Sequence, residues 1–598
     1  MRWWLFGVLA TAAVPSWAAH AYAQFGDIKY APGFTHFGYV NPDAPKGGEI
    51  RMVPPTRPTN FDKFNPFTLK GTAPYGIGTL MFESLLAGNS EEPTTAYGLL
   101  AEDVEVATDQ LSATFRINPL ARFQDGSPVL AADVVHSFTT LTGKLAAPQF
   151  RSIYAEVKGA RALDDRTVRF DFASPNRELP LVVGGMAVFS RAWGKGKPFD
   201  EVTTEQPVAS GPYKIDNPRM GRDVTYARDL RYWGADLPVR KGQFNFNRIT
   251  FKIYLDDTSR FEGLKAGEYD FMREFTSRNW ARQYTGKQFV SGEIRKQAFL
   301  NRNPGDFQGY VFNTRNPKFK DIRVRQAIGL AMDFEWLNKQ LFYGLYKRVQ
   351  GYFPNSEFHA EGLPKPDELA LLEPLRASLR PDVFGPAVIS PSTAPPGSLR
   401  ENLRQARTLL AEAGWTYRDG ALRNAKGEPF TIEFLNDQPS LIRVATPLQT
   451  ALLKLGIEVT FRTVDFSLAQ QRMENFEFEM TSARLPGSTA PGGELQELFG
   501  SKAAETHGSS NSWGIADPAV DALLQKVVGA TTRPQLITAL RALDRVLSHG
   551  YYSVPQYYGD AFLIGYRPQP FVLPSVVPPY YQPDTWAMST WWASSSNK

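Results

Sequence analysis

Apolar residues recur every three or four positions in several stretches of the C-terminal half, which is the spacing of one face of an α-helix. One of these faces follows Asp517-Pro518, where an acidic N-cap precedes a proline at the first helical position. Its apolar residues are Val520, Leu523, Leu524, Val527 and Val528. A second face follows Pro534 and contains Leu536, Leu540, Leu543, Val546 and Leu547. The pattern predicts two consecutive amphipathic helices.

A third helix is predicted after Ser398, because Ser398 and Glu401 have the spacing of a capping box. Its apolar face consists of Leu399, Leu403, Ala406, Leu409 and Leu410. Gly414 stands just beyond this face, where helices commonly end on a glycine.

Short apolar and alternating runs between the helices predict strands. Residues 431–435 form one such run, and a helical pattern follows with Leu448, Leu452 and Leu455. The next strand alternates apolar and polar positions through Ile457, Val459 and Phe461. A strand, a helix and a strand with short connections form a βαβ unit, so we expect a partly parallel sheet.

The N-terminal half is richer in strands and turns, at residues 113–117, 123–127 and 157–172. Asp125-Gly126 within them is a turn signal. No short-period repeat is visible, which excludes a solenoid. The predicted fold class is therefore α/β, with an additional strand-rich portion in the N-terminal half.

The first residues have the composition of a secretory signal peptide. Arg2 precedes an apolar stretch from Trp3 to Val14, and small residues lead to Ala21-Tyr22-Ala23. This pattern predicts residues 1–23 as a signal peptide that is cleaved near Ala23. A membrane anchor is the alternative, but the run is too short to span a bilayer core of about 30 Å.

Cysteine is absent, so no thiol is available for lipid attachment or for disulfides. We therefore expect a protein that is free in the periplasm and stabilised by ordinary cores. The 598 residues exceed what one core holds, so more than one domain is expected. Lys and Arg number 66 against 61 Asp and Glu, with no dense basic run, so a nucleic-acid partner is not expected.

The motifs of common catalytic and metal sites are missing. The six histidines do not have metal-ligand spacing, and neither a phosphate-binding loop nor a G-x-S-x-G nucleophile elbow occurs. A catalytic triad can be dispersed along a chain, so this absence does not exclude every enzyme. It favours a binding protein without metal or cofactor over a hydrolase.

One long stretch resembles a known family. Its segments are Tyr310–Arg315, Phe319–Ala327, Met332–Asn338 and Tyr352–Glu357. They resemble the extracellular solute-binding proteins of the oligopeptide/dipeptide class (family 5, cluster C), in particular the microcin C/oligopeptide branch. Further matches follow in the right order at Phe123–Gly126, Ala132–Val134, Ser210–Tyr213, Arg231–Gly234, Glu262–Asp270 and Gly508–Asn511. The resemblance covers nearly the whole mature chain, and its motifs identify the family better than the ligand.

The resemblance implies a two-lobed periplasmic-binding-protein-like fold of type II, with the ligand enclosed between the lobes. Lobe I is expected at residues 24–298 and is discontinuous, with an extra subdomain at about 71–190. Lobe II is expected at 299–553, and residues 554–598 return to lobe I. The inner-membrane permease of an ABC transporter would recognise the closed, ligand-bound form. A monomer is expected.

The resemblance also implies two groups of ligand contacts. Lys70, Gly71 and Thr72 match a contact strand of lobe I, where a glycine lets ligand backbone approach closely. A plain loop glycine is the alternative. In lobe II the matching positions are Ala483, Arg484, Leu485 and Gly487, followed by Ser510, Asn511 and Trp513.

Gly487 departs from the family pattern, because many peptide binders carry a carboxylate there for the α-amino group of the ligand. No acid follows before Glu494. A blocked ligand N-terminus, an acid from elsewhere such as Glu357, or a non-peptide ligand would each account for this, since a buried unpaired ammonium is costly. Arg484 stands where relatives often have tryptophan and could bind a carboxylate or phosphate, or simply be a solvated arginine.

The expected function is therefore capture of oligopeptides or peptide-like compounds for import by an ABC transporter. The alternatives are the same receptor fold with an oligosaccharide or another metabolite as ligand, and a periplasmic hydrolase. A signalling or chaperone role would use the same cleft.

Overall fold

The computed structural model describes residues 19–56 and 60–594, so most of the expected signal peptide lies outside the described residues. The chain forms two compact units. Unit 1 contains the described residues up to Met272 together with Tyr566–Pro578 and the C-terminal segment from Gln582. Unit 2 contains Arg273–Gly565 and Pro579–Tyr581.

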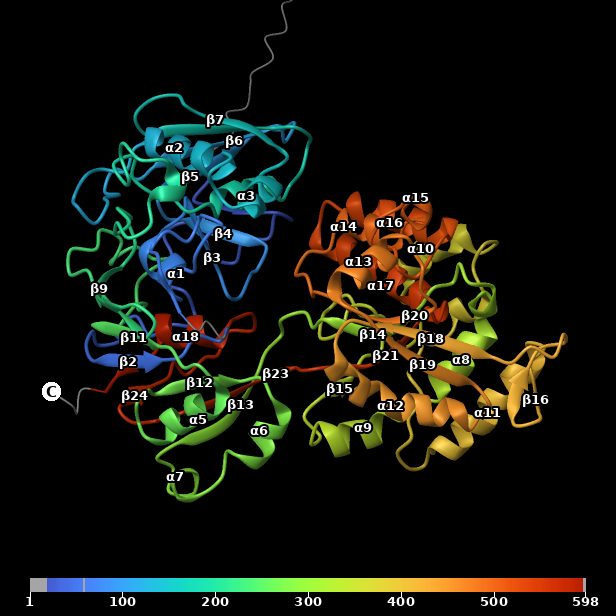
Figure 1. Cartoon of the computed structure of the whole chain (residues 1–598). Helices are drawn as coiled ribbons and strands as arrows, with labels where there is room; N and C mark the ends of the chain where they lie inside the picture. Colours follow the sequence, from blue (N-terminus) through green and yellow to red (C-terminus); the bar gives the residue numbers. More distant parts are fainter. Residues whose placement is uncertain (1–18, 57–59, 595–598) are drawn as a thin grey trace, which may run out of the picture. The chain divides into compact units, whose positions relative to one another are not determined.

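Unit 1 is built on three groups of strands (Figure 1). One sheet has the order β1 (Ala21–Ala23), β4 (Thr95–Gly98) and β3 (Leu86–Gly88). A second has the order β5 (Ala101–Val106), β6 (Ser112–Ile117), β8 (Thr167–Phe172) and β7 (Val157–Ala162). The third runs through β12 (Phe271–Glu274), β2 (Glu49–Met52), β11 (Arg248–Lys252), β10 (Asp223–Arg228) and β9 (Tyr213–Arg219).

The helices of unit 1 are short. They are α1 (Ile77–Met81), α2 (Ala131–Thr142), α3 (Pro148–Ile153), α4 (Leu179–Gly184), α5 (Asp257–Lys265) and α18 (Pro583–Thr590). The four-stranded antiparallel sheet, with α2 against β7 and β8, is the strand-rich portion that the sequence predicts. Residues 123–127 form its predicted turn, where Gly126 has a φ of +92° and the Phe123 N–H donates to the Ser127 carbonyl over 2.9 Å.

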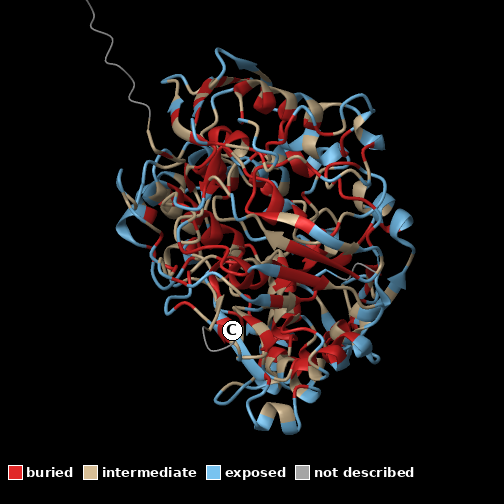
Figure 2. Ribbon diagram, turned by 90° about the vertical axis from the view of Figure 1, so that its left-hand side faces the viewer, coloured by how far each residue is buried: buried red, intermediate tan, exposed pale blue. Residues whose placement is uncertain are grey.

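The end of the chain is part of the core of unit 1. Strands β24 (Phe571–Val572) and β25 (Trp592–Ala593) pair with each other. Trp591 is fully buried and packs edge-on against Phe271 and Tyr566. The Asn245 side chain donates to the carbonyls of Thr590 and Trp591. In Figure 2 the buried positions concentrate on the strands and helices, and the exposed ones on turns and loops.

The expected cleavage point near Ala23 lies at the end of strand β1 and would remove the whole strand. Ala21, Tyr22 and Ala23 pair with Tyr97, Ala96 and Thr95, and Ala19 forms a bridge with Val104. The residues just before Ala23 therefore contribute backbone hydrogen bonds to unit 1.

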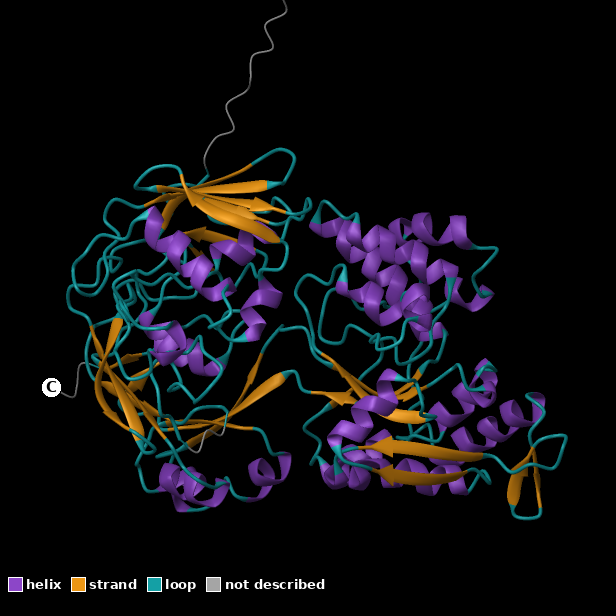
Figure 3. Cartoon of the chain, turned by 45° about the horizontal axis from the view of Figure 1, so that its top comes forward, coloured by secondary structure: helices purple, strands orange, loops and turns teal. Residues whose placement is uncertain are grey.

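Unit 2 is an α/β unit around one five-stranded sheet (Figure 3). Its order is β19 (Glu458–Thr463), β18 (Thr431–Asn436), β20 (Met480–Leu485), β14 (Phe307–Phe312) and β21 (Ser553–Pro555). Strands β18 and β19 are parallel and joined by α12 (Pro439–Leu453), which confirms the predicted βαβ unit. Strand β14 is antiparallel to both of its neighbours.

Two groups of helices flank this sheet in Figure 1. One group is α8 (Ile322–Leu330), α9 (Phe334–Leu341), α11 (Leu399–Glu412) and α12, whose buried apolar residues form one core with the sheet. The other is α10 (Pro366–Leu372), α13 (Phe466–Glu474), α14 (Glu494–Phe499), α15 (Ser501–Glu505), α16 (Pro518–Val528) and α17 (Arg533–His549). The remaining elements of unit 2 are α6 (Ser277–Arg282), α7 (Lys287–Val290), β13 (Arg295–Leu300), β15 (Lys347–Arg348), β16 (Thr416–Arg418), β17 (Ala421–Arg423), β22 (Tyr557–Tyr558) and β23 (Ala561–Tyr566).

The three predicted helices are confirmed as α11, α16 and α17. The Ser398 hydroxyl caps α11 by accepting the Glu401 N–H, and the Asp517 carboxylate caps α16 by accepting the Ala519 N–H. Helix α17 begins at Arg533, one residue before Pro534, because the Thr532 hydroxyl caps it. Gly414 follows α11 with a φ of +85°, as a terminating glycine should.

Helix α17 holds a long loop of unit 2 through one fully buried carboxylate. Asp544 accepts hydrogen bonds from the Tyr352 N–H (2.6 Å), the Ala360 N–H (2.9 Å) and the His359 ring (3.0 Å). The adjacent Arg545, also fully buried, donates to the carbonyls of Gly362 and Gly385. A buried charge needs such partners, so the loop 351–362 is fixed on α17.

This loop in turn holds the residues that precede β14. The Gly305 N–H donates to the Pro354 carbonyl over 2.8 Å. The Asn355 side chain donates to the carbonyls of Asn301 and Asn303. The conformation of residues 301–305 therefore depends on the loop that Asp544 holds.

We expect the stability of unit 2 to depend on the charge of His359. Burial lowers the pKa of His359, but the hydrogen bond and the charge of Asp544 outweigh it, and the pKa is raised above its usual value. The stabilisation is then complete below the unfolded pKa of about 6.5 and is lost as the pH rises through the raised folded pKa.

Urea unfolding from about pH 6 to about pH 8.5 measures this loss. The wild type should lose more unfolding free energy over that range than a His359→Gln variant. Equal losses in the two proteins would contradict the role of the His359–Asp544 pair.

Candidate functional site

The predicted lobe II contacts gather at one end of strand β20. Ala483, Arg484 and Leu485 pair with Gly309, Gln308 and Phe307 of β14. Gly487 follows in the loop that leaves the strand. Strand pairing therefore brings the start of β14 beside this loop, although 181 residues separate Asp306 from Gly487 in the sequence.

A carboxylate joins the strand end and the loop. Asp306 Oδ2 accepts a hydrogen bond from Arg484 Nε over 2.7 Å and another from Arg484 Nη2. Asp306 Oδ1 accepts the Gly487 backbone N–H over 3.0 Å. A single side chain therefore orients Arg484 and fixes the loop at Gly487.

Position 487 has no room for a side chain. A Cβ added to Gly487 would lie 2.2 Å from the Pro304 carbonyl oxygen and 2.8 Å from the Gly305 carbonyl oxygen. An acid at this position would require the backbone of residues 304–305 to move. The acid that the sequence does not provide at Gly487 is instead present as Asp306, beside the same loop.

Sequence reasoning missed Asp306. The residue directly precedes the matched segment 310–315, but the sequence does not show that this strand pairs with residues 480–485. The only available signal was an acidic residue at the start of a strand. The pairing of β14 with β20 gives that residue its place beside Arg484.

Glu357, the substitute acid that the sequence suggests, lies beside the same loop and is also paired. Its Oε1 accepts Arg533 Nε over 2.7 Å, while Arg533 Nη1 donates to the Thr489 carbonyl. Both acids near the loop are therefore bound to an arginine. Glu357 lies on the loop that Asp544 holds, so the same constraint positions it.

The Asp306–Arg484 pair is open to solvent. The side chain of Arg484 is 71% exposed and that of Asp306 is 28% exposed. Ion pairs at such exposure contribute only about 0–1 kcal/mol, because water competes for both charges. A charged group on a ligand can therefore take either partner without a large loss.

Ser510, Asn511 and Trp513 lie in a different loop of unit 2. The Ser510 residue is exposed, whereas Asn511 and Trp513 are fully buried. The Asn511 amide donates to the carbonyls of Gly500 and Ile515 and accepts from the Gly514 and Ile515 N–H groups. The hydrogen-bonding groups of the Asn511 side chain are therefore used by backbone groups of Gly500, Gly514 and Ile515.

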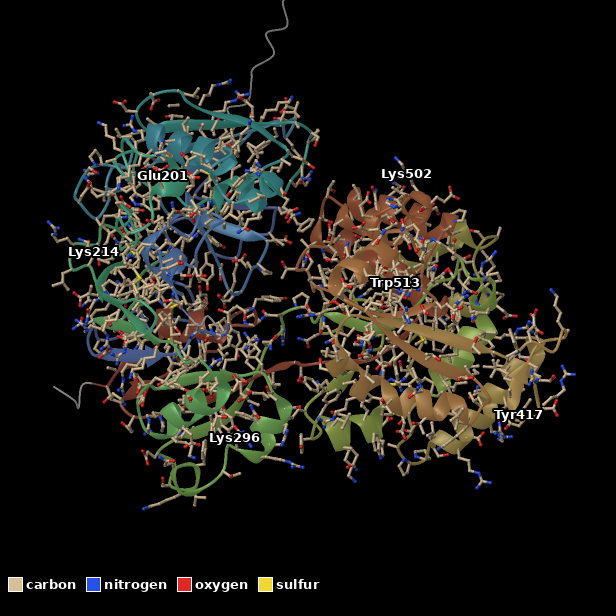
Figure 4. All side chains as sticks on the ribbon, in the orientation of Figure 1. Glu201, Lys214, Lys296, Tyr417, Lys502 and Trp513 are labelled. Atoms are coloured by element: carbon tan, nitrogen blue, oxygen red, sulfur yellow. The ribbon has the colours of Figure 1, made fainter. Side chains whose placement is uncertain are left out.

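The Trp513 indole N–H donates to the Ser553 hydroxyl over 2.7 Å. Figure 4 shows Trp513 in the interior of unit 2, whereas Lys502 lies at the surface. The Trp513 ring contacts Tyr352, and Tyr352 stacks on Phe307 with ring centroids 4.7 Å apart. Trp513 thus joins its loop to the start of β14, next to Asp306.

Lys70, Gly71 and Thr72 form an exposed loop of unit 1. The buried Lys63 ammonium supports this loop by donating to the carbonyls of Thr68 and Lys70, both over 2.6 Å. Gly71 has a φ of +79°, and an added Cβ would lie 2.6 Å from an Asp62 carboxylate oxygen. The glycine is therefore required by the loop itself.

Between residues 19 and 594, leaving out 57–59, the structure holds no cluster of three or more potential metal ligands. No helix in the same ranges has the length and apolar character needed to cross a membrane.

We predict that Gly487→Ala lowers the unfolding free energy by about 1–3 kcal/mol, because its Cβ overlaps the Pro304 carbonyl. Gly493→Ala is the matched control, since nothing lies within 4 Å of its Cβ and the glycine is in the same loop. The control should remain within about 0.5 kcal/mol of the wild type. Urea unfolding measures both, and equal stability of the two variants would contradict the close packing at Gly487.

Comparison with known proteins gives three informative similarities. A "Probable peptide-binding protein YejA" of Agrobacterium fabrum is 37% identical over 574 residues, covering 94% of this chain and 92% of that protein. A "Peptidoglycan-binding protein YepA" of the same organism is 34% identical over 557 residues, covering 90% of each chain. The oligopeptide-binding protein AppA of Bacillus subtilis, solved with a nonapeptide, is similar in structure with a TM-score of 0.61 at 19% identity, covering 92% of this chain and all of AppA.

The structural similarity confirms the predicted fold class, that of the periplasmic binding proteins. The family model of the bacterial extracellular solute-binding proteins, family 5, matches residues 95–506. The chain belongs to this family.

Proposed function

We propose that this protein is the periplasmic substrate-binding component of an ABC transporter and captures oligopeptides or peptide-like compounds. Membership of the solute-binding family and similarity to peptide-binding relatives support the proposal. The observation that carries it is the exposed Asp306–Arg484 pair at the end of β20. The carboxylate can bind the α-amino group of a peptide, and the guanidinium can bind a carboxylate carried nearby on the same ligand.

In this proposal Asp306 binds the α-amino group of the peptide in place of the acid that Gly487 cannot carry. Arg484 is released from Asp306 and binds a carboxylate of the ligand. Peptide backbone hydrogen bonds to the loop after β20 would accept many side-chain sequences, because the main chain is the same in all of them. Ala483, Leu485 and Ser510 would supply further contacts, with Asn511 and Trp513 holding the loop behind them.

We further propose the lobe boundaries that the sequence suggests, with lobe I at 24–298 and 554–598 and lobe II at 299–553. Lys70, Gly71 and Thr72 would then contact the ligand from lobe I. A ligand that binds the closed state more tightly than the open state shifts the protein to the closed state. The closed monomer would deliver the ligand to the inner-membrane permease without chemical change, so the protein is not an enzyme.

A muropeptide is a second candidate ligand, because the similar protein YepA is named for peptidoglycan binding. Such a ligand carries both a peptide and a sugar, which also accommodates the oligosaccharide alternative. Its free peptide carboxylates would bind Arg484 in the same way.

Native mass spectrometry of protein purified from periplasm identifies what is bound. The expected result is a heterogeneous set of added masses that fragment as peptides and are recovered intact after long incubation. A single non-peptide mass would contradict peptide capture. Ligand that is cleaved during incubation would contradict a purely binding role.

Substitution of the two acids tests how a ligand N-terminus is recognised. Asp306→Asn should weaken the binding of peptides with a free N-terminus about tenfold or more. The affinity for N-acetylated peptides should stay unchanged. Glu357→Gln is the matched control and should leave both peptide sets unchanged. Calorimetry of the two variants decides between the acids, and a loss confined to Glu357→Gln would overturn the assignment to Asp306.

We also propose that the signal peptide is cleaved after Ala18 and not after Ala23. In Ser16-Trp17-Ala18 the first and third residues are small, as in an A-x-A-like cleavage site. Cleavage there retains Ala19 and strand β1, which pair with Val104 and β4. The intact mass of the periplasmic protein should therefore begin at Ala19, and a mass beginning at Gln24 would contradict this site.

A further inference from the structure

A cavity lies within unit 2 beside the start of β14, where Phe307 is one of its lining residues. Its volume is about 250 Å³, and its walls come from α8, the segments 348–352 and 388–391, α11 and residues 548–555. None of the predicted ligand contacts lines it. The volume equals about eight water molecules at ~30 Å³ each, which is the size of a small metabolite.

The walls of this cavity carry positive charge only. Arg325 of α8 and Arg348 of β15 both line it, and no aspartate or glutamate is among its lining residues. Within the described part of the chain, neither arginine has a carboxylate at ion-pair distance. Buried charges in proteins normally have such a partner.

The two arginines differ in how many of their hydrogen-bond donors have an acceptor in the protein. Every guanidinium nitrogen of Arg325 donates to a backbone carbonyl, those of Phe319, Lys320 and Gly550. Arg348 is only 8% exposed, and its Nη1 donates to the Pro391 carbonyl. Its Nε and Nη2 have no acceptor among the residues that the structure describes.

The nearest acids do not neutralise Arg348 at close range. Asp333 and Glu335 attract it electrostatically but accept hydrogen bonds from Thr393. Burial lowers the pKa of Arg348 to about 10, so the side chain remains protonated at neutral pH. Nε is fully shielded, so Nη2 is the unused donor that Arg348 can offer to the cavity.

The cavity also has apolar lining residues. Leu330, Leu409, Val388 and Ile389 contribute aliphatic surface. Ile389 is largely exposed although it is a large aliphatic residue. A ligand that fits both the arginines and these apolar residues has an anionic head and a hydrocarbon body.

We propose that this cavity is a second binding site, for a small organic carboxylate with an apolar body. The carboxylate accepts a hydrogen bond from Nη2 of Arg348, and the positive charge of Arg325 strengthens the attraction. The apolar body lies against Leu330, Leu409 and Ile389. The site is independent of the proposed peptide site, because it shares no lining residue with the predicted ligand contacts.

Gly329 is a position where a larger side chain can fill the cavity without the removal of a charged residue. It lies in helix α8 and lines the cavity, and nothing lies within 4 Å of a Cβ added to it. A leucine at this position would extend into the empty space. It would also replace a helical glycine, which favours folding.

The test is fluorine NMR of the full mature protein with 4-fluorophenylacetate as the probe. Arg348→Gln and Gly329→Leu should each weaken binding of the probe at least tenfold. Gly329→Ala and Arg484→Gln are the matched controls and should bind it as the wild type does. Gly329→Leu keeps the test decisive if Arg348→Gln does not fold.

Four outcomes would overturn the proposal. They are no binding of the probe to the wild type, unchanged binding in Gly329→Leu, loss of binding in Arg484→Gln alone, and binding of inorganic phosphate without the carboxylate. Loss in Arg484→Gln alone would place the probe in the proposed peptide site. If the protein binds the carboxylate probe but no peptide, only the proposed function is contradicted.

Discussion

The hydrogen bonds of the buried Asp544 carboxylate fix the parts of unit 2 that carry the proposed ligand contacts. A fully buried carboxylate is tolerated only when its oxygens are satisfied, and Asp544 achieves this with the backbone of Tyr352 and Ala360 and the ring of His359. The loop so held fixes residues 301–305 through Pro354 and Asn355. Those residues in turn exclude a side chain at Gly487 and place Asp306 beside Arg484. A charge inside the unit thus determines how charges at its surface are arranged.

The same loop contributes residues to the surroundings of both proposed sites. Its first residues, Gly351 and Tyr352, line the carboxylate cavity, and Glu357 lies beside the loop that leaves β20. Tyr352 also stacks on Phe307, which directly follows Asp306. Occupation of the cavity would therefore restrict a segment that supports the start of β14. The packing between them is aromatic and close, so a displacement of Tyr352 would reach Phe307.

Local patterns in the sequence predicted much of this fold. The caps Ser398 and Asp517 and the apolar spacing after them predicted α11 and α16, because capping and amphipathic periodicity involve residues that are neighbours in the chain. The site depended on pairings that no local pattern contains. Asp306 meets Gly487 only because β14 pairs with β20. The sequence does not separate Arg323 from Arg325 either, yet Arg323 pairs with the half-buried Asp321 and Arg325 is buried against backbone carbonyls.

Arg484 and Arg348 illustrate two physical routes by which a protein keeps a cation available for a ligand. Arg484 has a partner, but the pair is exposed, so in the proposed function displacement of Asp306 by a ligand costs about 0–1 kcal/mol. Arg348 has no carboxylate to displace, and its burial makes an anion that reaches it bind in a low-dielectric setting. The exposed pair suits ligands that share only their charged ends. The buried arginine in a cavity of about 250 Å³ suits a small ligand that also covers the apolar lining residues.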